Sequence, residues 1–217
     1  MDLNNIQCPI CGSKNLTPKN SFCIFMKKKI YRFKCADCDL IFGPIEYINL
    51  TKNQLADKYK ELYKSYAEND STEYEVKTFL SLFPEKGGSY LNYGSGKWSK
   101  SKEIINSMGY TIDCFDFSFN DVDTLLSKKY DGIISNNLIE HLQHPVEDFL
   151  LFRDLLKEGK MMAHSTPCYE YRYDYSIFHL YFFIGRSLEL LAKKTGFELE
   201  HYIQDGEYIL KRFIKTD

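Results

Sequence analysis

The sequence predicts an α/β fold, in which a mostly parallel sheet follows a small metal-binding segment. From residue 85 onward, strand-like runs such as 89–93 and 130–135 alternate with amphipathic helical runs such as 144–159. The chain then closes on "FELEHYI" and "EYILKRF", two strands around an Asp-Gly turn. Alternating strands and helices favour a parallel sheet, and the final hairpin makes the last strand antiparallel. Two C-x-x-C pairs mark the segment in front of it.

Length and charge point to an ordinary globular protein. The 217 residues suffice for one core with a small appendage, and the net charge is −2. Residues 1–50 are basic, with seven Lys and Arg against four Asp and Glu. The start of the chain lacks the layout of a signal peptide, and the apolar run "IFHLYFFIG" is too short for a membrane helix. We therefore expect a cytoplasmic protein without membrane insertion; the oligomeric state stays open.

The cysteine pairs "CPIC" and "CADC" predict a zinc ribbon over residues 1–48. The pairs are separated by 23 residues, and the stretch between them contains a strand or hairpin pattern. Two such pairs complete a tetrahedral sulfur shell, which suits Zn²⁺ in a structural role. Redox-active dithiols are the alternative, but they need a βαβ context that is absent here. The predicted ligands are Cys8, Cys11, Cys35 and Cys38, whereas Cys23, Cys114 and Cys168 are interpreted as buried thiols.

A helical connector is predicted over residues 49–84, ahead of the main domain at 85–217. Within it, apolar and aromatic residues recur at helical spacing: Leu55, Tyr59, Leu62, Tyr63 and Tyr66. An amphipathic connecting helix is the simpler interpretation. The alternative is that its tyrosines close over a cofactor site.

The run "SYLNYGSGKW" predicts a strand, a glycine turn and a helix. Gly94 and Gly96 let the backbone approach a ligand, because they carry no Cβ. Asp116 ends the next strand, 22 residues after Gly94. A carboxylate at that place can accept hydrogen bonds from ribose hydroxyls, although a helix N-cap is the alternative role.

Several segments resemble the successive motifs of class I S-adenosylmethionine-dependent methyltransferases, which have a Rossmann-like sheet. These are "YLNYGSG", "CFDFS", "YDGIISNNLIEHLQHPVEDF", "LLKEGKMMAHSTP" and "LELLAKKTGFE". The ribbon segment "YRFKCADCDLIFGP" is similar to the subgroup that has an N-terminal zinc ribbon. The Glu-His-Leu segment and the ribbon are the specific parts of this resemblance, which covers nearly the whole chain.

The resemblance implies a cofactor site for S-adenosylmethionine. It places the methionine end at the glycine turn, the ribose at Asp116, and Asn136 near the sulfonium. The cofactor-binding residues it implies are Tyr93, Gly94, Ser95, Gly96, Asp116, Phe117 and Asn136. A dinucleotide is also compatible with Asp116, but the missing third glycine and the Glu-His-Leu segment favour S-adenosylmethionine.

Three departures from the family pattern stand out. Asn92 replaces an acid, and Trp98 replaces the third glycine. Only residues 117–129 are available between the second and fourth strands of the family, enough for one crossover. We expect a single helix there, built on Val122, Leu125 and Leu126. The third strand is then absent, and the sheet order becomes 2-1-4-5-7-6.

The candidate catalytic residues are His141 with Glu140, and His179 in "SIFHLYFF". Methyl transfer needs a positioned acceptor and, for many acceptors, removal of a proton, which histidine can perform near neutral pH. The alternative for both histidines is a structural role.

Three functions are compatible with these patterns. The first is methyl transfer to a small molecule or a carrier-linked sugar; the sugar is suggested only by the ribbon resemblance. The second is an RNA methyltransferase whose basic ribbon docks phosphates. The third is a degenerate methyltransferase fold that serves as a scaffold, which the shortened middle and Asn92 motivate.

Overall fold

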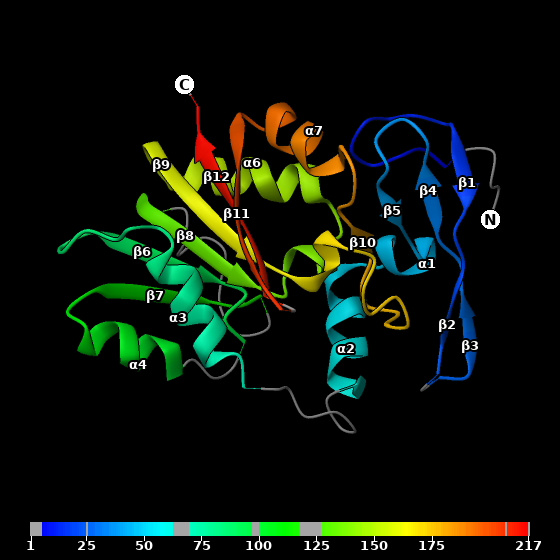
Figure 1. Ribbon diagram of the computed structural model, residues 1–217. Helices are drawn as coiled ribbons and strands as arrows, with labels where there is room; N and C mark the ends of the chain where they lie inside the picture. The colour runs from blue at the N-terminus through cyan, green and yellow to red at the C-terminus, as the bar shows by residue number, and fades with distance from the viewer. Residues whose placement is uncertain are drawn as a thin grey trace.

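The central element is a six-stranded sheet with the order β11-β12-β9-β8-β6-β7 (Figure 1). The computed structural model describes residues 6–24, 26–62, 70–96, 100–117, 127–206 and 208–216. The strands are β6 (Ser89–Tyr93), β7 (Thr111–Phe115), β8 (Tyr130–Asn136), β9 (Leu156–Ser165), β11 (Phe197–Asp205) and β12 (Tyr208–Lys215).

The directions and order of these strands confirm the predicted sheet. β6 pairs in parallel with β7 and β8, and β8 pairs in parallel with β9. β12 is antiparallel to both of its neighbours, β9 and β11. The order is the expected 2-1-4-5-7-6, and within the described residues no strand lies beyond β7. The helix expected on Val122, Leu125 and Leu126 lies outside the described residues.

Helices cover both faces of the sheet. α3 (Thr72–Leu80) and α4 (Lys100–Ser107) lie on one face, and α6 (Pro145–Leu155) and α7 (Ser187–Lys194) on the other (Figure 1). Pro145 begins α6, where its missing N–H costs nothing. The predicted extension of this helix to residue 159 is wrong, because Leu156 already begins β9. None of the described helices has the length and apolarity to cross a membrane.

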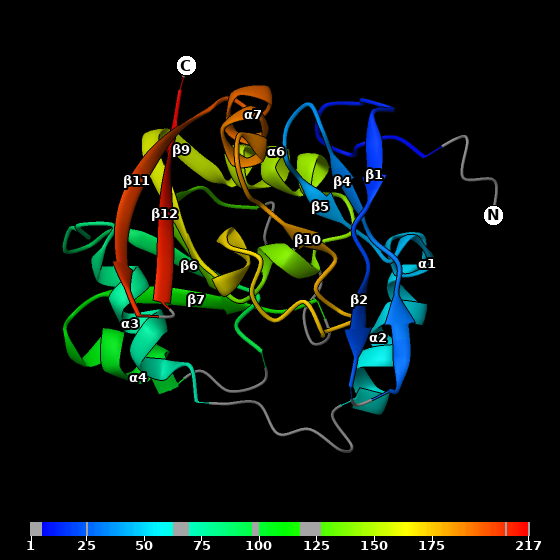
Figure 2. The same cartoon turned by 45° about the vertical axis from the view of Figure 1, so that its right-hand side comes forward.

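The N-terminal segment is built from five short strands. They are β1 (Leu16–Pro18), β2 (Ser21–Cys23), β3 (Lys28–Ile30), β4 (Phe33–Cys35) and β5 (Ile41–Phe42). β2 and β3 form a hairpin, as the sequence between the cysteine pairs predicted. β1, β4 and β5 form a second sheet, and β10 (Tyr181–Phe182) joins its edge beside β5 (Figure 2). Two distant parts of the chain therefore share one sheet.

A buried arginine links the same two parts. The Arg32 side chain, between β3 and β4, is 0% exposed and lies over the Phe182 ring. Its guanidinium donates to the carbonyl oxygens of Asp174, Ser176 and His179 at 2.7, 2.6 and 3.1 Å. It also donates to the carbonyl of Gly43 at 3.2 Å. Burial lowers the pKa of Arg32, but a guanidinium stays charged at neutral pH.

Two helices lead from the ribbon into the larger sheet domain. The first is α1 (Ile45–Ile48). At its C-terminal end, the Gln143 side-chain amide donates to the carbonyl oxygens of Tyr47, Ile48 and Leu50 at 3.1, 3.1 and 2.6 Å. α2 (Lys52–Leu62) follows and is the predicted tyrosine-containing helix. Its residue Tyr59 packs on the Phe178 ring at 4.7 Å between centroids. Tyr63 and Tyr66 lie outside the described residues.

Replacing Arg32 tests how strongly the ribbon is attached. Arg32→Met leaves several buried carbonyl groups without donors, so we expect the free energy of unfolding to fall by about 3 kcal/mol or more. Urea unfolding of the full chain in the presence of zinc measures this change. Lys34→Met is the matched control, because Lys34 is partly exposed and pairs with Asp39 at the surface. The free energy of unfolding of the control should fall by less than about 1 kcal/mol. An equal fall for both variants would contradict the assigned role of Arg32.

Candidate functional site

The sequence-predicted cofactor residues meet at the carboxyl edge of the sheet. Tyr93 and Phe115 pair across the last rungs of β6 and β7, and Asn136 pairs with Ser165 at the ends of β8 and β9. The segments that follow these strands carry the predicted residues. In α/β sheets this edge is where ligands bind.

The turn after β6 is held by backbone hydrogen bonds to the end of β7. Gly94 and Gly96 have φ angles of 80° and 64°, a region that favours glycine. The Gly94 and Ser95 amides donate to the carbonyl of Phe115 at 2.7 and 3.0 Å. A Cβ on Gly94 would lie 2.6 Å from the Leu138 side chain, so glycine is also required by packing. Trp98, which replaces the third glycine, lies outside the described residues.

Asp116 connects the end of β7 to this turn. Its carboxylate accepts a hydrogen bond from the Gly96 amide at 3.1 Å. Phe117 follows it with 41% of its surface exposed, edge-on to Phe115. Tyr93, in contrast, is fully buried against Phe115 and Phe152, so only its backbone faces the turn. The predicted turn and the predicted acid are thus brought together.

Asn136 holds a buried donor without a partner. Its Oδ1 accepts from the hydroxyls of Thr78, at 2.8 Å, and Ser165. Its Nδ2 is buried and makes no hydrogen bond in the structure. Unpaired buried donors are rare and costly in folded proteins. Thr78, which orients the amide from α3, has no signal in the sequence that would have identified it.

Glu75 is a further residue that the sequence analysis missed. It lies on α3, is only 6% exposed, and its carboxylate accepts from the Asn92 amide at 2.8 Å. The hydroxyls of Ser71 and Ser101 also donate to it. A carboxylate therefore stands beside Asn92 although the strand itself lacks the acid. Its only signal was an acidic residue near a helix start, which is common on any helix.

His141 is held in one tautomer. It follows β8 in the short helix η2 (Ile139–His141), and its Nδ1 lies 2.8 Å from the Phe178 carbonyl oxygen and 2.9 Å from the Tyr59 hydroxyl. A carbonyl oxygen can only accept, so Nδ1 carries the proton and Nε2 is the basic nitrogen. Burial lowers the pKa of His141 to about 4, which keeps the ring neutral at pH 7.

Glu140 and His179 lie beside His141, so the three predicted catalytic residues form one group. The rings of His141 and His179 are 5.1 Å apart. Glu140 is fully buried, and its Oε1 accepts from the Thr166 hydroxyl at 2.7 Å. Burial raises the pKa of Glu140 to about 7. His179 Nδ1 lies 3.4 Å from the Cys168 sulfur.

The four predicted zinc ligands come together at the end of the ribbon. The sulfur atoms of Cys8, Cys11, Cys35 and Cys38 all lie within 4.8 Å of one another. Two of the sulfur pairs, Cys8–Cys38 and Cys11–Cys35, are each 3.5 Å apart. Zinc–sulfur bonds of about 2.3 Å in a tetrahedron set sulfur atoms about 3.8 Å apart, so the cluster fits a four-thiolate ion. A hydrogen bond from Cys38 lowers the pKa of Cys8 to about 5, which favours a thiolate.

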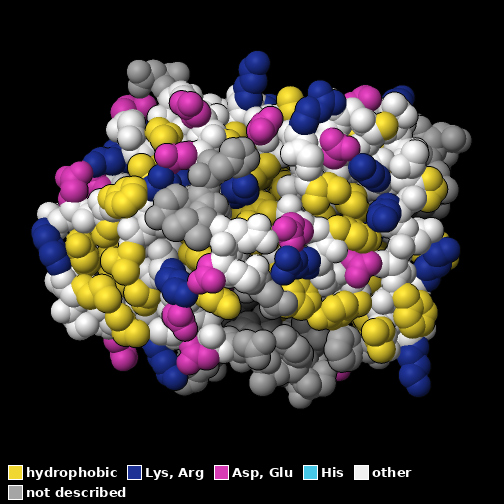
Figure 3. Space-filling view, viewed as in Figure 1, with side chains coloured by type: hydrophobic (Ala, Val, Ile, Leu, Met, Phe, Trp, Pro, Cys, Tyr) yellow, Lys and Arg dark blue, Asp and Glu magenta, His cyan; other side chains and the backbone are white. Residues whose placement is uncertain are grey.

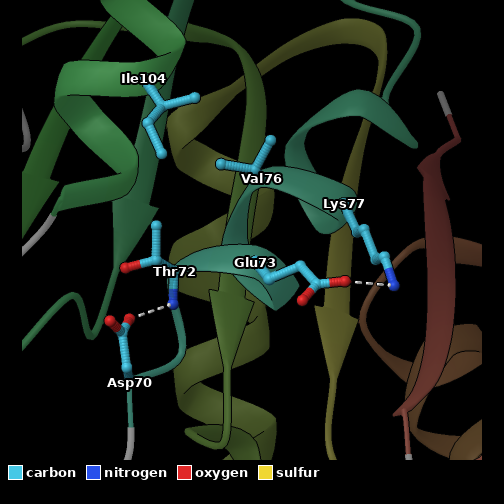
Figure 4. A pocket seen from close by; sticks show the side chains of 6 residues that line it. All are labelled: Asp70, Thr72, Glu73, Val76, Lys77 and Ile104. Carbon is cyan, nitrogen blue, oxygen red and sulfur yellow. Dashed lines mark hydrogen bonds and ion pairs between the residues drawn. The ribbon is translucent and has the colours of Figure 1, made fainter.

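An open surface groove of about 490 Å³ lies between α3 and α4 (Figure 4). Asp70 caps the Thr72 amide there, and Glu73 pairs with Lys77 at 2.9 Å (Figure 4). None of its lining residues belongs to the predicted site. Because its polar groups satisfy one another, the groove offers no chemistry of its own.

Comparisons with known proteins agree with this geometry. The family model of the methyltransferase domain matches residues 66–202. The fold is similar to the 1,6-didemethyltoxoflavin-N1-methyltransferase of Burkholderia thailandensis, solved with 1,6-didemethyltoxoflavin and S-adenosylhomocysteine. The TM-score is 0.57 at 11% identity, covering 92% of this chain and 100% of that chain. No functionally curated protein matches the sequence.

Two further solved structures are less similar. One is an S-adenosylmethionine-dependent methyltransferase of Thermotoga maritima, described as a possible histamine N-methyltransferase, with a TM-score of 0.43 and 17% identity over 75% of this chain and 97% of that chain. The other is a TehB-like methyltransferase of Corynebacterium glutamicum. Its TM-score is 0.46 at 14% identity, covering 80% of this chain and 100% of that chain. The family match covers more than half of the sequence. The chain therefore belongs to the class I S-adenosylmethionine-dependent methyltransferases, and carries a four-cysteine cluster in front of the methyltransferase domain.

Proposed function

We propose that this protein transfers a methyl group from S-adenosylmethionine to a small molecule or a carrier-linked sugar. The observation that carries the proposal is the link between the glycine turn and Asp116 at the carboxyl edge of the sheet. It fixes a carboxylate beside a turn in which two of three residues, Gly94 and Gly96, carry no side chain. Both are features that an adenosyl amino acid needs for recognition.

The residues at this edge fit the cofactor. The Gly94, Ser95 and Gly96 amides are used within the protein, so the turn offers its carbonyl oxygens, which suit an ammonium group. Asp116 would accept from the ribose hydroxyls and disfavour a 2′-phosphate. The unpaired Asn136 Nδ2 supplies a buried donor. When bound, S-adenosylmethionine supplies the methyl group on a sulfonium, and the protein has to orient the acceptor.

His141 is the base in this proposal. Its Nδ1 proton is committed to the Phe178 carbonyl, so Nε2 is the nitrogen that would take a proton from the acceptor. Tyr59 and Phe178 hold the ring in place, and both residues belong to segments anchored to the ribbon. α2 thus contributes to the acceptor side, which supports the interpretation that this helix covers part of the site.

The face of the molecule shown in Figure 3 favours a small acceptor over RNA. On the face shown in Figure 3, basic and acidic side chains alternate, and dark blue and magenta groups do not separate into patches. Docking of a phosphate backbone requires a continuous stripe of basic side chains. The Burkholderia methyltransferase of similar fold was solved with a small molecule, which also supports this acceptor class. The four-cysteine cluster is then a structural zinc site.

Calorimetry with S-adenosylmethionine tests the cofactor assignment. Asp116→Asn keeps an oxygen for the Gly96 amide but removes the charge, so the turn survives while the ribose loses its partner. We expect the dissociation constant to rise about 10- to 100-fold, the range for one hydrogen bond to a charged group. Asp113→Asn, on the strand β7 that precedes Asp116, is the control, because Asp113 pairs with Lys128 on the surface. Absence of binding by the wild-type chain at millimolar cofactor would leave the scaffold alternative ahead.

Turnover of His141→Gln tests the base. The probes are nucleoside diphosphate sugars, and release of S-adenosylhomocysteine is the measurement. With any sugar that the wild type methylates, turnover should fall about 10²- to 10⁴-fold, while cofactor affinity stays within about threefold. His144→Gln, three residues away and exposed, should keep full activity. Unchanged turnover in His141→Gln would remove this histidine from the mechanism.

A further inference from the structure

A second group of metal-ligating side chains lies away from the ribbon cluster. Glu140, Cys168 and His179 each contribute one ligand atom, and these atoms lie within 4.8 Å of one another. They come from three separate segments: η2, the short helix η3 (Pro167–Tyr169), and the loop before β10. From the sequence, Cys168 is expected to be a buried thiol, because nothing in its neighbourhood along the chain pairs with it.

The distances suit a shared ion. The Cys168 sulfur and His179 Nδ1 are 3.4 Å apart. In a tetrahedral zinc site, bonds of about 2.3 Å to sulfur and about 2.0 Å to nitrogen place these two atoms about 3.5 Å apart. A thiol and a neutral imidazole at this distance form at best a weak hydrogen bond. The separation of 3.4 Å fits such a hydrogen bond and also fits two corners of a coordination shell.

Glu140 supplies an independent observation. The residue is 0% exposed, its Oε1 is used by Thr166, and its Oε2 is buried without any hydrogen-bond partner. A buried carboxylate oxygen that lacks a partner costs free energy, because it has lost water and gained nothing. A cation bound between this oxygen, the sulfur and the imidazole would satisfy it.

The charges of the group balance a divalent ion. One thiolate and one carboxylate carry two negative charges, which cancel those of a divalent cation in the buried site. The neighbouring cation is Arg32, whose guanidinium donates to the carbonyl oxygens of Asp174, Ser176 and His179. With these acceptors in place, Arg32 holds the segment that carries His179.

Backbone hydrogen bonds fix the three ligand segments to one another. The Leu180 amide donates to the Glu140 carbonyl at 2.8 Å, and the Phe183 amide donates to the Cys168 carbonyl at 2.9 Å. The Thr166 hydroxyl contacts both the Glu140 carboxylate and the Cys168 amide. The ligand atoms are therefore held in place by the fold, and metal binding requires little reorganisation.

We propose that Glu140, Cys168 and His179 bind a second zinc ion. A set of one sulfur, one nitrogen and one oxygen favours zinc over magnesium or calcium, which prefer oxygen alone. Three protein ligands leave the fourth position to a water molecule. The ion joins η2, η3 and the loop before β10. In this arrangement Glu140 and His179 hold the ion, and His141 is the residue left to accept a proton.

Metal analysis of the full chain tests the proposal. The protein is saturated with Zn²⁺, desalted, and its zinc is counted by mass spectrometry. We expect about two zinc ions per wild-type chain, and about one in Cys168→Ala and in His179→Ala, because the ribbon keeps its four thiolates. Cys23→Ala is the matched control: it removes another buried thiol that lies outside both groups and should keep about two.

Cobalt substitution provides a readout that does not depend on the variants folding. Co²⁺ added to the wild-type apoprotein should fill two spectroscopically different sites, one with four thiolates and one with a single thiolate. A wild-type chain that saturates at one zinc ion and shows only the four-thiolate spectrum overturns the proposal. So does a folded Cys168→Ala variant that keeps two ions. Neither measurement depends on methyl transfer, so a failed activity assay leaves this test intact.

Discussion

The buried guanidinium of Arg32 is the interaction on which the arrangement of the site depends. Taking a charge out of water costs several kcal/mol unless its donors are all used, and here the Ser21 hydroxyl and carbonyl groups from residues 174–179 and Gly43 accept from them. The segment that accepts these bonds continues into β10, which completes the ribbon sheet. It also carries Phe178, whose carbonyl fixes the His141 ring. The ribbon therefore positions a residue of the sheet edge from a distance.

The absence of the third family strand in the described part of the chain leaves this edge intact. This edge contains the ends of β6, β7 and β8, which pair in parallel in the expected order. The strand that is missing would lie outside β7, on the far side from β6. Its absence removes none of the residues that hold the glycine turn, because the turn is bonded to Phe115 and Asp116. A reduced sheet is thus compatible with an intact turn.

Local patterns in the sequence predicted most of the fold. The glycine turn, the closing hairpin, the start of α6 at Pro145 and the shortened crossover all depend on residues close together in the chain. The sheet order came from the family resemblance combined with the shortened crossover. The end of α6 was not predictable, because Leu156 suits helix and strand equally and β8 decides the outcome by pairing with it. Likewise Arg32 and Thr78 act through partners far along the chain, which periodicity cannot identify.

The position of Glu75 changes the meaning of Asn92. In the sequence, an amide where the family has an acid was one reason to consider a degenerate scaffold. In the structure, Glu75 reaches Asn92 from α3, so the strand end has a carboxylate after all, supplied by a helix instead of the strand. The same carboxylate accepts from Ser101 in the first turn of α4, which joins α3, β6 and α4 around the glycine turn. A site that had lost its function would not need to keep a buried, fully bonded acid there, since burying an acid is costly in itself. The substitution at position 92 is therefore better explained as a relocation of charge than as decay.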